Sequence, residues 1–133
     1  MIVDTSAIVA ILQGEEEESA FREALAAAEH AYLSAANYLE LAIVTDRIGD
    51  PVLGRRLDEV LDTLDITVVD VTAEDARTAR QAARDYGRGS GHPARLNFGD
   101  CFSYALAART GEPLLFKGDD FSRTDLRPGA PQP

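Results

Sequence analysis

The sequence has one cysteine, one methionine and no tryptophan among its 133 residues. The lone Cys101 excludes an internal disulfide bond and any zinc site built from several cysteines, and it is compatible with a reducing compartment. No apolar run reaches the roughly 20 residues that a membrane-spanning helix needs, and no basic segment precedes the apolar start as in a signal peptide. We therefore expect a soluble, cytoplasmic protein that does not associate with a membrane.

Basic residues are also scarce, because 13 lysines and arginines face 23 aspartates and glutamates and leave a net charge of −10. Taken alone, this balance argues against non-specific binding to nucleic acid, which requires clustered positive charge. The hydrophobic share of 45% and the charged share of 27% are typical of a soluble globular chain. The length predicts a single domain over residues 1–133, with residues 128–133 as a frayed tail rich in proline and glycine.

Short apolar segments alternate with longer segments of helix-forming residues. The runs MIV, ITVV and PLLF are continuous and apolar, which is typical of strands buried in a parallel sheet, and AYLS is a fourth candidate strand. Short strands separated by helices predict an α/β fold with helices on both faces of the sheet. We expect helices from Thr5 or Ser6, with either hydroxyl as the N-cap, and then over roughly residues 15–30, 35–50, 51–65, 72–87 and 100–110.

Several carboxylates lie where a charge is costly or where a strand meets a helix. Asp4 ends the first strand and Asp100 begins a helix after a loop, while Asp119 and Asp120 follow the last strand. Glu40 is the sole charge in the middle of a helix that is apolar nearly all round, and a helix of that kind is buried. Helix capping, turn formation or an ion pair with an arginine would explain each acid separately.

Considered together, these acids suggest a shared metal site. The carboxyl ends of parallel strands meet at one edge of a sheet, which is where ligands bind in folds of this class. Several carboxylates that converge there repel one another, and a divalent metal ion would neutralise them. Oxygen ligands without histidine or cysteine indicate Mg²⁺ or Mn²⁺. One such ion, or two about 4 Å apart, suits the hydrolysis of a phosphodiester bond.

Four stretches of the chain are similar to a known family: MIVDTSAIVAIL, NYLELAIV, LNFGDCFSYALAARTGEPLLFKGDDF and the closing RTDL. They resemble the PIN-domain ribonucleases, and specifically the VapC-type toxins of bacterial toxin–antitoxin modules. The resemblance implies a PIN-like three-layer α/β/α sandwich with a short, mostly parallel sheet of about four to five strands. It places the family's catalytic and metal-binding acids on Asp4, Glu40 and Asp100, with Ser6 and the neighbouring Thr5 in support.

The fourth acid falls between two neighbours. Many relatives show an Asp-x-Asp-Phe pattern where this chain reads GDDF. The resemblance therefore favours Asp120 as the catalytic acid and keeps Asp119 as a second candidate metal ligand. Asn37 and Asn97 are candidate hydrogen-bond donors in the same region.

The resemblance further implies an Mg²⁺- or Mn²⁺-dependent endoribonuclease that cleaves structured RNA such as tRNA or a ribosomal RNA loop. It implies neutralisation by a cognate VapB-type antitoxin, and a homodimer that forms a heterotetramer or larger complex with that antitoxin. Two alternatives stay open. A receiver-like phospho-acceptor domain would use an acidic pocket, Mg²⁺ and Lys117, but it needs paired acids where Asp4 stands alone. A catalytically inactive PIN-fold binding module would keep the fold without the chemistry.

Contacts to RNA require positive surface, and one expected helix offers it. Arginines recur there at spacings of three and four, which places them in one stripe, and the following loop adds another arginine. The alternative is a solvated helix face that pairs with Glu74 and Asp85. The candidate RNA-binding residues are Arg77, Arg80, Arg84, Arg88 and Arg95.

The aromatic residues and the cysteine are expected to pack in the core. We interpret Cys101 as a small buried hydrophobic residue, because no histidine adjoins it to activate a nucleophile. The aromatic residues expected in the core, rather than as stacking surfaces for bases, are Tyr38, Phe98, Phe102, Tyr104 and Phe121.

Overall fold

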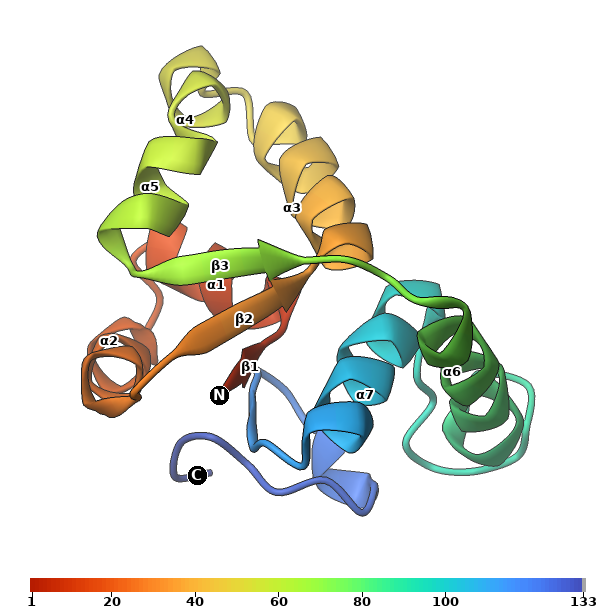
Figure 1. Ribbon diagram of the computed structural model, residues 1–133. Coiled ribbons are helices and arrows are strands. Elements are labelled where there is room, and N and C mark those ends of the chain that lie inside the picture. The colour runs from red at the N-terminus through yellow and green to blue at the C-terminus, as the bar shows by residue number, and fades with distance from the viewer. Residues whose placement is uncertain (133) are drawn as a thin grey trace.

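The computed structural model describes residues 1–132 and shows a four-stranded sheet with helices on both faces (Figure 1). The strands are β1 (Ile2–Val3), β2 (Ala31–Ser34), β3 (Ile66–Val69) and β4 (Leu114–Leu115). They lie in the order β3-β2-β1-β4 and all neighbouring pairs are parallel. The α/β class and the short parallel sheet expected from the sequence are confirmed.

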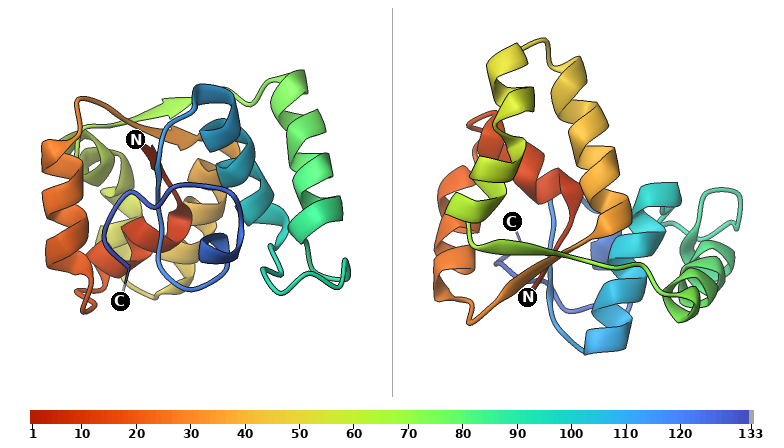
Figure 2. Two further views of the ribbon diagram at one scale, coloured as in Figure 1. Left: turned by 90° about the horizontal axis from the view of Figure 1, so that it is seen from below. Right: turned by 45° about the horizontal axis from the view of Figure 1, so that its top comes forward.

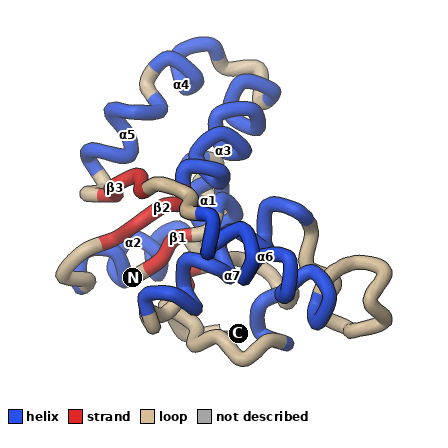
Figure 3. The backbone as a smooth tube through the Cα atoms, turned by 45° about the vertical axis from the view of Figure 1, so that its right-hand side comes forward, coloured by secondary structure: helices blue, strands red, loops and turns tan. Residues whose placement is uncertain are grey.

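Helices form the two outer layers, as Figures 2 and 3 show from other directions. One side of the sheet carries α1 (Thr5–Leu12), α2 (Glu18–Ala27), α3 (Ala35–Arg47), α4 (Pro51–Arg55) and α5 (Leu57–Thr63). The other side carries α6 (Ala73–Tyr86), α7 (Phe98–Thr110) and the short 3₁₀ helix η1 (Phe121–Arg123). Among residues 1–132, no helix is both long enough and apolar enough to cross a membrane.

Strand side chains alternate between two hydrophobic cores, because successive residues of a strand point to opposite faces. Val3 and Leu115 belong to the core shared with α1, α2, α3 and α5. Ile2 and Leu114 belong to the core shared with α6 and α7. All four are at most 1% exposed, so both faces of β1 and β4 are covered, and the three-layer arrangement is confirmed.

Helix starts differ from the expected ones by a residue or two. The N-cap of α1 is Asp4, whose side chain accepts a hydrogen bond from the backbone N–H of Ser6, so neither Thr5 nor Ser6 is the cap. Helix α7 begins at Phe98 and is capped by Asn97, ahead of the expected start at residue 100. Any of these short polar side chains can accept a backbone hydrogen bond, and the backbone geometry decides which one does.

The single helix expected over residues 51–65 is wrong, because the structure divides it into α4 and α5 at Arg56. Arg56 has φ −102° and ψ 9°, outside helical geometry, and its backbone N–H bonds to the carbonyls of Val52 and Leu53. Gly54 precedes the break, and glycine favours a helix interior less than alanine by about 1 kcal/mol.

The frayed tail expected from residue 128 is also contradicted over its first three residues. Pro128 forms a β-bridge with Leu114, and the backbone N–H of Gly129 donates to the Leu114 carbonyl at 2.6 Å. Ala130 is 7% exposed and belongs to a hydrophobic core. The tail packs there because β4 is an edge strand whose backbone groups need partners.

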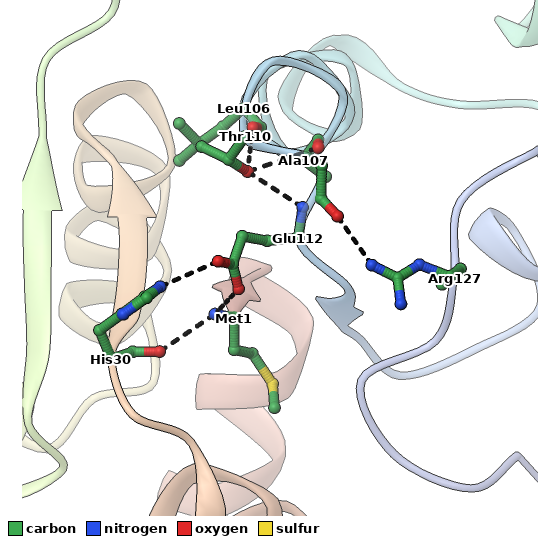
Figure 4. A network of polar contacts seen from close by, with 8 residues as sticks. Met1, His30, Leu106, Ala107, Thr110, Glu112 and Arg127 are labelled. Atoms are coloured by element: carbon green, nitrogen blue, oxygen red, sulfur yellow. Dashed lines mark hydrogen bonds and ion pairs between the residues drawn. The ribbon is translucent and has the colours of Figure 1, made fainter.

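The amino-terminal edge of the sheet is tied together by a polar network (Figure 4). The Met1 ammonium group forms an ion pair with Glu112 and donates to the His30 carbonyl at 3.0 Å. The other carboxylate oxygen of Glu112 lies 2.9 Å from Nε2 of His30. This network joins the segments that precede β1, β2 and β4, and it leaves the opposite edge for the candidate site.

Candidate active site

A pocket of about 380 Å³ opens at the carboxyl edge of the sheet, where the chain leaves β1 and β4. It brings together three of the acids predicted from the sequence, Asp4, Glu40 and Asp100, which come from separate elements. The pocket is lined by Asp4, Thr5, Ser6, Val9, Glu15, Glu40, Asn97, Asp100 and Lys117.

Asp4 is held by hydrogen bonds to both of its carboxylate oxygens, and it is 3% exposed. Oδ2 accepts from the backbone N–H of Ser6 at 3.0 Å and from the Ser6 hydroxyl at 2.6 Å. Oδ1 accepts from the Ser103 hydroxyl at 2.5 Å. The carboxylate is therefore fixed by the fold itself, as a preorganised ligand requires.

A buried polar network extends behind Asp4. The Ser103 hydroxyl also lies 3.1 Å from Oδ1 of Asn37, and Nδ2 of Asn37 donates to the Gly99 carbonyl at 3.0 Å. Thr5 adds a hydrogen bond from its hydroxyl to the Asn37 carbonyl at 3.3 Å. Both Ser103 and Asn37 are fully buried, so the network joins the start of α1 to α3 and α7 beneath the pocket.

Ser103 is the supporting residue that the sequence analysis missed. Its signal is spacing, because it lies one turn after Asp100 and Asn37 lies one turn before Glu40. Residues three apart on a helix share a face. A serine or asparagine on the same helix face as each acid thus indicates a buried hydrogen-bond network between the two helices.

Asp100 takes part in the cap of α7 and also lines the acidic pocket. Asn97 and Asp100 form a capping box: the Asn97 backbone N–H donates to Oδ2 of Asp100 at 2.9 Å, and the Asp100 N–H donates to Oδ1 of Asn97 at 2.8 Å. Burial raises the pKa of Asp100 from 3.8 to about 7, against this backbone hydrogen bond, which lowers it. The negative charges of Asp4, Asp120 and Glu40 raise the pKa further.

Glu40 lies on a helix that is not buried all round, which corrects the expectation for this segment. The Glu40 side chain is partly exposed, while Leu39 is 60% and Ile43 is 41% exposed. One face of α3 packs on the sheet and on α1 and α7, and the apolar residues on its other face point to solvent. The burial that we expected for Glu40 from an apolar neighbourhood is therefore absent.

Gly99 explains how close Glu40 comes to α7. A Cβ atom at Gly99 would lie 1.9 Å from Oε2 and 2.6 Å from Cδ of Glu40. Such distances are far inside van der Waals contact, so the Glu40 carboxylate rests directly on the backbone of α7. Glycine is needed here for close approach and not for a special backbone angle.

The two candidates for the fourth acid, Asp119 and Asp120, both lie outside the lining of the acidic pocket. The negative charge of Asp120 raises the pKa of Asp100. Asp119 instead lines a separate pocket with Glu17 and Lys117. Asp120 therefore stays the first candidate for the fourth acid and Asp119 the second, as the sequence pattern predicts.

Lys117 lines the acidic pocket, and its charge pairs with Glu15, another residue of the lining, rather than with Asp4, Glu40 or Asp100. Its ammonium group forms ion pairs with Glu15 and with Glu17, the latter at 3.2 Å. Its backbone N–H donates to the Ser6 hydroxyl at 3.0 Å, which helps to orient that serine toward Asp4. Within residues 1–132, no basic side chain forms an ion pair with the four acids Asp4, Glu40, Asp100 and Asp120.

The chemistry of these residues fits a divalent cation. The donors are carboxylate oxygens, which Mg²⁺ and Mn²⁺ prefer, and their uncompensated charge contributes to the raised pKa of Asp100. In the described part of the chain, no group of three or more acids, histidines or cysteines is arranged closely enough to hold an ion. Asp4, Glu40 and Asp100 nevertheless line one pocket, and the side chains of Glu40 and Asp120 keep surface exposure.

The candidate RNA-binding arginines are all exposed, and those on α6 form part of a stripe. Arg80 and Arg88 line a groove between α6 and α7. Arg77 and Arg84 lie roughly 40–60° from Arg80 around the axis of α6. Arg95 lies in the loop before α7 with φ 54°. For residues 1–132, the expected alternative of ion pairs from these arginines to Glu74 or Asp85 is not observed.

Comparison with known proteins agrees with this fold. The PIN domain family model matches residues 1–126. Ribonuclease VapC42 of Mycobacterium tuberculosis is 57% identical over 128 residues, which cover 96% of this chain and 98% of that protein. Ribonuclease VapC28 of the same species is 56% identical over 127 residues and 96% of each chain, and ribonuclease VapC30 is 48% identical over 95% of each.

Two solved structures have the same fold. M. tuberculosis VapC20, described as a sarcin-ricin loop cleaving toxin, aligns with a TM-score of 0.76 and 19% identity over 98% of both chains. A toxin–antitoxin complex from Klebsiella pneumoniae aligns with a TM-score of 0.67 and 17% identity, over 91% of this chain and 89% of that one.

The fold and site define a three-layer α/β/α domain with an acidic pocket at the carboxyl edge of its sheet. The chain belongs to the PIN-domain family and, within it, to the VapC ribonucleases. The family resemblance seen in the sequence is confirmed, and the receiver-like alternative is excluded.

Proposed function

We propose that the chain is a metal-dependent endoribonuclease toxin that hydrolyses phosphodiester bonds in structured RNA, such as tRNA or a ribosomal RNA loop. The observation that carries this proposal is the acidic pocket, where Asp4, Glu40 and Asp100 meet and form no ion pair with a basic side chain of residues 1–132. Membership of the VapC ribonucleases supports the reaction class, and it supports a cytoplasmic location, where such RNA is found.

The residues of the pocket have separate roles in this proposal. Asp4 supplies a fixed carboxylate, because Ser6 and Ser103 bond both of its oxygens. Asp100 supplies a second one, and its cap interaction with Asn97 leaves one oxygen free. A bound ion would polarise the scissile phosphate and activate water for attack. The residues that would hold Mg²⁺ or Mn²⁺ are Asp4, Glu40, Asp100 and Asp120, with Asp119 as the second candidate for the last position.

Partners follow from the same family membership. We propose a VapB-type antitoxin as the inhibitor, supported by the toxin–antitoxin complex among the structural neighbours. We propose a homodimer that assembles with the antitoxin as a heterotetramer or larger complex. The exposed Leu39 and Ile43 of α3 and Val52 of α4 support an interface, because these two helices pack together and leave large apolar side chains in solvent. Light scattering of the isolated chain measures whether it is a dimer.

RNA cleavage tests the proposal. Purified protein is incubated with total RNA and with Mg²⁺ or Mn²⁺, and parallel reactions contain EDTA. We expect discrete fragments that disappear with EDTA and fall by about 100-fold or more in Asp4→Asn and Asp100→Asn. The matched control is Asp62→Asn, which removes one exposed carboxylate from α5.

Two outcomes would contradict the proposal. Cleavage that persists in EDTA and in both pocket variants would show that the acidic pocket is not the catalytic site. Binding of RNA without cleavage under any metal condition would favour the inactive PIN-fold binding module.

A further inference from the structure

A groove of about 590 Å³ lies between α6 and α7, which Figures 1 and 2 show side by side. Its α6 wall is apolar and flat, because the residues at successive turns are Ala76, Ala79 and Ala83, and Cys101 of α7 lines it as well. Asn97 lines both this groove and the acidic pocket. The groove therefore adjoins the candidate active site at Asn97, the residue that caps α7 and bonds to Asp100.

Phe98 stands in this groove with 82% of its surface exposed, contrary to the expectation that it packs in the core. It is the first residue of α7, next to the cap, so its side chain projects beyond the packed face of the helix. Its ring meets the Phe102 ring at an edge-to-face angle of 80°, with centroids 5.0 Å apart. One aromatic ring thus supports the other and leaves a face open to solvent.

Positive charge flanks the same groove. Arg80 and Arg88 line it and are both exposed, and in the described residues neither forms an ion pair. In a chain with a net charge of −10, two free guanidinium groups beside an open aromatic ring are an unusual local surface. The aromatic ring favours a planar, apolar part of a ligand, and the two guanidinium groups favour an anionic part.

We propose that this groove binds an unpaired base of the RNA substrate next to the scissile phosphate. The base stacks on Phe98, and Arg80 and Arg88 contact the flanking phosphates. The groove volume lies within the range of roughly 300–1,000 Å³ in which proteins hold small-molecule-sized groups. The inference rests on the proposed ribonuclease function and adds to it the requirement that a nucleotide beside the cut is unpaired.

The test measures RNA binding separately from cleavage. Fluorescence anisotropy follows the binding of a labelled single-stranded polyadenylate decamer, and of an RNA duplex of equal length, in EDTA. The groove variants are Phe98→Ala and Arg80→Gln. The controls are Val68→Ala, which shortens an exposed apolar side chain on β3, and Arg55→Gln, which removes an exposed charge from α4.

Wild-type protein is expected to bind the single strand more tightly than the duplex. Phe98→Ala should weaken single-strand binding by about five- to 150-fold, as the loss of one base stack does, without changing its salt dependence. Arg80→Gln should lower the slope of log affinity against log salt concentration by about 0.7. Both controls should bind like the wild type.

Single-strand binding by Phe98→Ala at wild-type affinity would overturn the inference and would leave the groove to a protein partner. Cleavage of total RNA by the wild type, measured in parallel with Mn²⁺, separates the two proposals. If cleavage is present while Phe98→Ala binds normally, the groove inference fails alone. If the wild type neither binds nor cleaves RNA, both proposals fail.

Discussion

Replacing Gly99 with alanine should slow RNA cleavage strongly without unfolding the protein. The three atoms nearest to the new Cβ would all belong to the Glu40 carboxylate, at 1.9, 2.6 and 2.8 Å. A partly exposed glutamate can rotate away, so we expect the collision to displace Glu40 and to leave the core intact. Alanine also favours the helix by up to about 1 kcal/mol, which would raise the melting temperature by up to a few degrees.

The assay combines thermal unfolding with the rate of metal-dependent RNA cleavage. We expect Gly99→Ala to lower the cleavage rate by about 100-fold, as Glu40→Gln does, because both remove the same carboxylate from the site. Gly54→Ala is the matched control. Its Cβ would lie 2.6 Å from Oδ1 of Asp46, on the surface of α4 and away from the pocket, so it should keep the wild-type rate.

Two results would refute this reasoning. A wild-type cleavage rate in Gly99→Ala would mean that the position of Glu40 against α7 is not needed for the reaction. A loss of folding in Gly99→Ala would mean that Glu40 cannot move and that the contact is structural.

Three further predictions concern charges and hydrogen bonds of the fold. Because the pKa of Asp100 rises from 3.8 to about 7, the metal-free folded state binds more protons than the unfolded state in that window and loses stability as the pH rises. Asp100→Asn should thus raise the free energy of unfolding by up to about 4 kcal/mol near pH 8 but little near pH 4. Denaturant titrations at the two pH values measure this difference. An effect of the substitution that does not change with pH would contradict the prediction. Ser103→Ala leaves one oxygen of buried Asp4 without its hydrogen-bond donor, so it should lower the free energy of unfolding by about 1–3 kcal/mol and slow RNA cleavage. An unchanged unfolding midpoint would argue against the network. The N-terminal ammonium group holds the pKa of Glu112 at about 2, so the stabilisation that this carboxylate gives the folded state is complete above about pH 4.5 and is lost as the pH falls toward 2. Glu112→Gln should flatten the curve of stability against pH between these values. An unaltered curve would count against the ion pair.

The sequence was sufficient for the fold because strand and helix signals were strong and local. The apolar runs around Val3, Leu33, Val68 and Leu115 all became strands of one parallel sheet. The division at Arg56 and the packed tail at Ala130 were not predictable in the same way. The first depends on the backbone angles of one residue, and the second on the edge of a strand that only the folded sheet presents.

For the site, the sequence supplied the acids and not their surroundings. Asp4 and Asp100 stood at predicted element ends, and the pocket brings both together with Glu40. Ser103 was missed because a serine among apolar helix residues has no signal of its own until its buried partners are known. Phe98 was misassigned because hydrophobicity alone does not distinguish a core aromatic residue from one that projects beside a helix cap.

Metal-linked stabilisation tests the central claim most directly, because it reports binding without requiring an RNA substrate. The melting temperature is measured at about pH 7.5 with and without Mn²⁺, for the wild type and for Asp100→Asn. At an Mn²⁺ concentration of about 100 times the dissociation constant, binding should stabilise the wild type by about 2.7 kcal/mol, and the variant should show little or no shift. An equal shift in both proteins, or none in either, would contradict a metal site at this pocket.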